Sequence, residues 1–175
     1  MPQVEFYSIE SRSDPKSESS SDTKSDTRSG SNSGSSSDSK SEAKPSKLPI
    51  AHIVEVITRG YRKGQKIFIN AESKYQAELL DEKLWTQDAK SFLPHQLVGE
   101  DENTKPPIEI GFGQNPSIRA DILINLADEV PAFYQPMKWI FEYAYGDEEK
   151  KEKARAKFRF YRQQNCLINH KKISG

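Results

Sequence analysis

The sequence has few of the residues from which disulfides and metal sites are built. It contains one cysteine, Cys166, and three histidines, His52, His95 and His170, which are scattered along 175 residues. A single thiol forms no internal disulfide, and widely spaced histidines give no zinc-type cluster. We therefore expect no metal site and no bound cofactor.

Net charge and long apolar runs are also absent. The chain carries 26 basic and 26 acidic residues, so no overall field draws it onto nucleic acid or an acidic membrane. No apolar run approaches the roughly 20 residues that span a bilayer, and the first ten residues lack the basic-then-apolar order of a signal peptide. We expect a cytoplasmic protein that does not contact membranes.

One segment lacks large apolar side chains altogether. Between residues 11 and 41, 15 of 31 residues are serine, interleaved with balanced acidic and basic residues. Such a segment buries too little apolar surface to offset its ordering entropy, so we predict that residues 11–47 are a disordered insertion. Residues 1–10 and 48–175, 138 residues together, then make one domain of ordinary size.

Hydrophobic periodicity predicts alternating strands and helices. Apolar residues spaced three and four apart predict amphipathic helices over 48–62 and 72–85. Pro131 predicts the first turn of a helix that continues to Phe141, and a charged helix is expected over 147–164. Short β-prone runs occur at 4–9, 66–70, 108–112 and 122–126. Strands separated by helices indicate an α/β sheet covered on both faces.

Two glycine-containing segments superficially resemble nucleotide-binding motifs. In GYRKGQK, from Gly60 to Lys66, three residues separate the glycines, no Ser or Thr follows, and a strand comes next. A phosphate loop needs four residues between its glycines and a Lys-Ser or Lys-Thr pair that opens a helix. Gly111 and Gly113 follow a strand, but Pro116 occupies the third glycine position of the dinucleotide fingerprint. We expect neither a nucleotide site nor an enzymatic activity.

The stretch from Leu80 to Glu100 joins a helix end to an apolar loop. Trp85 lies at the end of the predicted helix, and residues 92–98 contain five apolar side chains, among them Phe92. This loop either folds back on its own sheet or presents a patch to a partner chain, in which Trp and Phe serve as anchors. No nucleophile accompanies His95 in a recognisable motif, so we expect this histidine to hydrogen-bond to loop backbone.

The last predicted helix combines basic residues with an aromatic side chain. Acidic residues fill its first turn and seven basic residues follow, an order that complements the helix dipole. One face has cations around a ring: Lys151, Arg155, Phe158, Arg159 and Arg162. This face suits an acidic peptide that ends in a hydrophobic residue, but a solvated helix face and a nucleic-acid patch also fit it.

Several strings along the chain resemble one family. LDEKLWTQDAKSFLPHQLVGE, FYSI, KGQKIFINAES, PPIEIGF, RADILINLADEVPAFY and ARAKFRFYRQQN are similar to segments of the chi subunit of bacterial DNA polymerase III holoenzyme. The resemblance covers nearly the whole chain except residues 10–47. It implies a Rossmann-like three-layer sandwich with a mostly parallel central sheet, and it assigns residues 4–9 to the first strand of that domain.

The resemblance also implies partners and contact residues. In chi subunits the corresponding helix binds the acidic C-terminal tail of single-stranded-DNA-binding protein, whose terminal phenylalanine enters a small pocket. The matching positions here are Lys151, Arg155, Phe158 and Arg159, with Ala144 and Tyr145 flanking the pocket. Trp85 and Phe92 match the surface that contacts the psi subunit or a competing helicase.

The implied function is that of a non-catalytic accessory subunit of the clamp-loader complex. It would bridge psi to the tail of single-stranded-DNA-binding protein during DNA replication and would meet DNA only indirectly. The alternative is a module that binds nucleic acid directly through its basic last helix.

Overall fold

The structure, a computed structural model, describes residues 1–10, 48–86, 92–101 and 103–174. The predicted disordered insertion, 11–47, lies outside the described residues. In chain order the elements are β1 (Gln3–Glu10), α1 (Ile50–Arg62), β2 (Ile67–Asn70), α2 (Lys74–Thr86), β3 (His95–Leu97), β4 (Ile108–Gly111), β5 (Ile122–Asn125), the 3-10 turn η1 (Ala132–Tyr134), β6 (Trp139–Ala144), α3 (Glu148–Gln163) and β7 (Leu167–Ser174).

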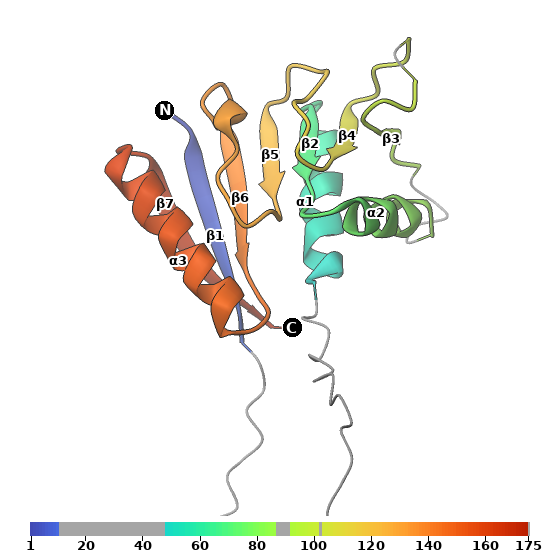
Figure 1. Cartoon of the computed structure of the whole chain (residues 1–175). Helices are drawn as coiled ribbons and strands as arrows, with labels where there is room; N and C mark the ends of the chain where they lie inside the picture. Colours follow the sequence, from blue (N-terminus) through green and yellow to red (C-terminus); the bar gives the residue numbers. More distant parts are fainter. Residues whose placement is uncertain (11–47, 87–91, 102, 175) are drawn as a thin grey trace, which may run out of the picture.

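Seven parallel strands form one sheet, in the order β3-β4-β2-β5-β6-β1-β7 (Figure 1). The first strand of the chain, β1, lies inside the sheet between β6 and β7. Parallel neighbours need crossover connections, and here helices supply several of them, which places helices on the faces of the sheet. The predicted Rossmann-like fold with a parallel central sheet is confirmed.

Helices cover the two faces of this sheet. Buried side chains of α1 and α2 pack into one apolar cluster together with Tyr7, whereas α3 contributes to a second cluster together with Phe6. Because successive side chains of a strand point to opposite faces, neighbouring residues of β1 belong to different clusters. Figure 1 shows α3 beside β1 and β6, and α1 and α2 beside β2 and β4.

Gly60 allows α1 to lie close to the sheet. A Cβ atom at this position would lie 2.7 Å from Ile122 Cδ1 and 3.0 Å from Ile67 Cδ1. Gly64 follows the helix with a φ of +69°, a left-handed conformation that glycine adopts without strain. Both glycines of the segment that superficially resembles a phosphate loop therefore have structural roles.

The predicted helix from Pro131 to Phe141 is wrong. Residues Ala132–Tyr134 form only the short turn η1, and strand β6 begins at Trp139. Pro136 opposes a longer helix because it has no N–H to donate and its ring clashes with the preceding turn. The residues of β6 instead alternate between the two apolar clusters, with Ile140 in one and Tyr143 in the other. Strands β3 and β7 are further elements that periodicity did not predict.

Candidate partner-binding surfaces

A hollow of about 540 Å³ opens between α3 and the sheet. We call it the α3 hollow. It brings together five of the six residues predicted to bind an acidic tail: Ala144, Lys151, Arg155, Phe158 and Arg159. Five further residues line it: Phe6, Ser8, Ile9, Ala154 and His170.

The first turn of helix α3, which carries the predicted tail-binding residues, is capped. The Asp147 side chain accepts a hydrogen bond of 3.0 Å from the backbone N–H of Lys150, and Glu148 and Glu149 follow in the first turn. Carboxylates at a helix N-terminus are favourable because they face the positive end of the helix dipole. Residues four apart then lie on one side of the helix, so Arg155 and Arg159 lie in successive turns.

The inner part of the α3 hollow is apolar. Phe158 is half-buried, and its ring meets that of Phe6 edge-on, with the ring centroids 5.3 Å apart. Ala144 and Ala154 add small side chains that leave room above the sheet. A hollow with an apolar interior and cations at its rim can hold a hydrophobic residue that is followed or preceded by carboxylates.

The arginines at the rim are bound by acidic residues of the same helix. Arg155 Nη1 lies 2.7 Å from Glu148 Oε1 and 2.9 Å from Glu152 Oε2, and Arg159 Nη2 lies 3.0 Å from Glu152 Oε1. Hydrogen bonds from Arg155 and then Arg159 lower the pKa of Glu152. The ion pairs of the two arginines are exposed, so they are weak and exchangeable. Lys151 has no ion pair within the part of the chain that the structure describes.

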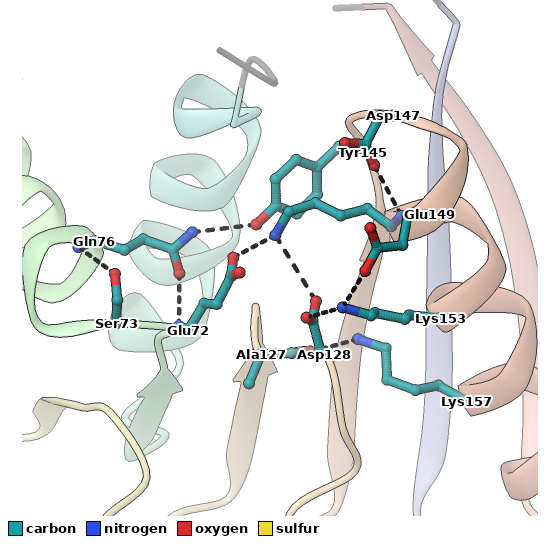
Figure 2. A network of polar contacts seen from close by, with 11 residues as sticks. Glu72, Ser73, Gln76, Ala127, Asp128, Tyr145, Asp147, Glu149, Lys153 and Lys157 are labelled. Atoms are coloured by element: carbon teal, nitrogen blue, oxygen red, sulfur yellow. Dashed lines mark hydrogen bonds and ion pairs between the residues drawn. The ribbon is translucent and has the colours of Figure 1, made fainter. Parts of the chain in front are cut away.

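Three lysines of α3, Lys150, Lys153 and Lys157, face the body of the protein. Lys150 binds Glu72 and lies 3.7 Å from Asp128. Lys153 Nζ lies 2.7 Å from Asp128 (Figure 2). Lys157 Nζ lies 2.8 Å from the carbonyl oxygen of Ala127. Burial alone would raise the pKa of Asp128, but the hydrogen bond from Lys153 and the charge of Lys150 keep it below its ordinary value. Lys150, Lys153 and Lys157, which we call the inner row, hold α3 against the sheet.

Tyr145 is the predicted tail contact that the α3 hollow does not include. Ala144 and Tyr145 are neighbours at the end of β6, so their side chains point to opposite faces of the sheet. Tyr145 is buried in the α1 and α2 layer, where its hydroxyl accepts a hydrogen bond of 3.1 Å from Gln76 Nε2. Burial raises the pKa of this hydroxyl.

Trp85 and Phe92 form an exposed aromatic pair, which we call the aromatic patch. Their exposed fractions are 57% and 65%, and their ring centroids lie 5.5 Å apart. Leu93, next to Phe92, is buried. His95 packs its ring 4.9 Å from Trp85 and donates from Nδ1 to the carbonyl oxygen of Leu93 at 2.6 Å, which confirms the expected backbone hydrogen bond.

The two surfaces belong to different regions of the sheet. The aromatic patch lies at the end of α2 and just before β3, which is one edge strand. The α3 hollow includes His170 of β7, the opposite edge strand. The two surfaces therefore lie toward opposite edges of the sheet.

Within the described ranges, no three His, Cys, Asp or Glu side chains gather closely enough to hold a metal ion. Of the helices that the structure describes, none is both long and apolar enough to cross a membrane.

Comparisons with known proteins agree on one family. A family model described as DNA polymerase III chi subunit, HolC, matches residues 46–169. DNA polymerase III subunit chi of Haemophilus influenzae is 38% identical over 114 residues, which cover 65% of this chain and 79% of the relative. The subunits of the same name from Pseudomonas aeruginosa and Escherichia coli are 32% identical over 132 residues and 33% identical over 118 residues. These matches cover 74% and 67% of this chain, and 92% and 80% of the relatives.

Proposed function

The chain belongs to the DNA polymerase III chi subunit family, whose role is accessory to DNA replication, and on this premise we propose that it is a non-catalytic adapter. One surface holds the psi subunit or a competing helicase. The other holds the acidic C-terminal tail of single-stranded-DNA-binding protein. Linking two weak contacts raises the effective concentration of the polymerase assembly near coated template.

The observation that carries the proposal is the composition of the α3 hollow. Phe158 and Phe6 supply an apolar interior, and Arg155 and Arg159 lie at the rim. A tail that ends in phenylalanine can insert its ring into this interior while its acidic residues meet the guanidinium groups, which bind carboxylates in a planar, often bidentate manner. The same helix thus provides both kinds of contact that such a tail needs.

Direct binding of nucleic acid through α3 is less well supported. Nucleic-acid binding relies on several free cations that neutralise phosphates. Of the seven basic residues in α3, three bind carboxylates on the side of the helix that faces the body of the protein: Lys150, Lys153 and Lys157. The three inner lysines point toward the body of the protein, which leaves a short cationic rim suited to a peptide.

The aromatic patch is the contact that we propose for psi or a helicase. Trp85 and Phe92 are exposed although both are large and apolar, whereas Leu84 and Leu93 beside them are buried. Exposed Trp and Phe next to a well-packed aliphatic base are typical anchors of protein interfaces.

Titration of a synthetic acidic peptide ending in phenylalanine tests the tail assignment. Arg155→Ala should weaken binding by about tenfold, because it removes a charge-assisted hydrogen bond. Arg62→Ala is the matched control, since Arg62 is exposed at the end of α1 and does not line the α3 hollow. Equal affinity of wild type and Arg155→Ala would refute the site. A steep salt dependence with single-stranded DNA alone, at an affinity above that for the peptide, would support the nucleic-acid alternative.

A further inference from the structure

We infer that Glu152 is a built-in competitor for the acidic tail, so that it sets how readily carboxylates enter the α3 hollow. The inference rests on the proposed function, because it concerns the same site. Glu152 weakens binding of the tail, whereas Arg155, Phe158 and Arg159 strengthen it.

The geometry of Glu152 carries this inference. Its Oε2 lies 2.9 Å from Arg155 Nη1 and its Oε1 lies 3.0 Å from Arg159 Nη2. One carboxylate therefore bridges two guanidinium groups in the manner expected of a ligand carboxylate. A tail residue that approaches the same nitrogens must displace Glu152 or share them with it.

The charges around the rim lead to the same conclusion. Lys151, Arg155 and Arg159 supply three positive charges, and Glu148 and Glu152 oppose two of them at distances of 2.7 to 3.0 Å. The rim therefore attracts a carboxylate only weakly before exchange occurs. Replacing Glu152 by a neutral residue both frees the guanidinium groups and raises the net charge of the rim by one.

Glu152 has no part in holding α3 to the sheet. Among the residues that the structure describes, its ion pairs join residues of α3 alone, at spacings of three and seven. By contrast, Lys150 and Lys153 join α3 to Asp128 in another segment, as Figure 2 shows for Lys153 and Asp128. Exposed ion pairs within one helix add little to stability, so loss of Glu152 leaves the fold intact.

The test compares Glu152→Gln with Glu149→Gln in the full chain. Glu149 is the matched control because it lies in the same helix, and the substitution changes the net charge equally. Glu149 pairs at 3.0 Å with Lys153 of the inner row, away from Arg155 and Arg159. The probes are a synthetic acidic peptide that ends in phenylalanine and the same peptide with its Asp residues replaced by Asn.

Glu152→Gln should tighten binding of the acidic peptide by about twofold to fivefold, the range in which exposed ion pairs contribute. Glu149→Gln should leave the affinity unchanged, and neither variant should gain affinity for the amide peptide. In an Arg155→Ala background the gain from Glu152→Gln should shrink, because one of the two competed groups is gone.

The possible failures are distinguishable. If wild type binds the acidic peptide but Glu152→Gln binds it equally well or more weakly, the competitor role is refuted and the tail site stands. Equal gains in Glu152→Gln and Glu149→Gln would also refute it, since they would report net charge alone. If the acidic peptide does not bind wild type, the proposed function itself is refuted.

Discussion

Lys157→Met tests how the inner face of α3 is held to the sheet. Lys157 Nζ lies 2.6 Å from Glu142 Oε2, and the side chains are only 7% and 0% exposed. Glu142 Oε1 accepts hydrogen bonds from Asn125 Nδ2 at 2.8 Å and from the Tyr161 hydroxyl at 2.9 Å. Methionine fills a similar volume without a charge, so the substitution leaves the Glu142 carboxylate buried beside two donors but without a cation.

Breaking a buried pair by removing one partner costs about 3–5 kcal/mol, since an uncompensated charge stays in the interior. We therefore expect Lys157→Met to lower the free energy of unfolding by an amount in this range. Adding Glu142→Gln should recover part of the loss, because glutamine keeps an acceptor for Asn125 and Tyr161 but has no charge to strand.

Urea unfolding at pH 7, monitored by circular dichroism, measures these differences when the m value stays constant. Lys153→Met is the control, since it removes a lysine of the same inner row whose side chain is 41% exposed, and it should change stability little. A loss below about 1 kcal/mol in Lys157→Met, or no recovery in the double variant, would contradict the account of a buried, charge-compensated anchor.

Two further predictions concern the sheet and the aromatic patch. Deleting residues 11–46 should leave a folded protein, because loop-closure cost changes only slowly with length. Deleting residues 1–46 should lower stability strongly, since it removes β1 from between β6 and β7; comparable thermal melting of the two variants would show this reasoning to be wrong. Leu93→Ala should cost about 2–5 kcal/mol in urea unfolding, because Leu93 is 4% exposed. Phe92→Ala should stay within about 0.5 kcal/mol, and equal losses in these two variants would mean that Phe92 packs inward.

Sequence periodicity predicted the helices, each of which buries one face. The helices α1, α2 and α3 each lie within a predicted range or within two residues of it, because apolar or charged faces repeat at the helical period. β6 was mistaken for a helix because Pro131 is a common first residue of helices and a run of aromatic residues fits both periods. This segment is a strand because it pairs with β5 and β1, and such pairing is not a local property of the sequence.

Edge strands gave the weakest sequence pattern. β3 has only three residues, and β7 contains His170, Lys171 and Lys172, which are exposed and break the alternation that marks a half-buried strand. Polar residues on an edge strand discourage pairing between molecules, and they also hide the strand from a reading of hydrophobic pattern.

The same contrast holds at the α3 hollow. Lys151, Arg155 and Arg159 were predictable because one helix positions all of them. The contributions of Phe6 and His170 depend on the register of β1 with β7, in which these two residues are partners although they are far apart in the chain. No local pattern could place His170 beside α3, and neither could local spacing show that Tyr145 turns toward α2.

We propose that one molecule holds two partners through separate surfaces. The most direct measurement is binding of the purified psi subunit of the same organism and of the acidic, phenylalanine-terminated peptide to wild type, Arg155→Ala and Phe92→Ala. We expect wild type to bind both ligands at once, Arg155→Ala to lose affinity only for the peptide, and Phe92→Ala to lose affinity only for psi. Competition between the two ligands on wild type, or loss of both ligands in either variant, would contradict it.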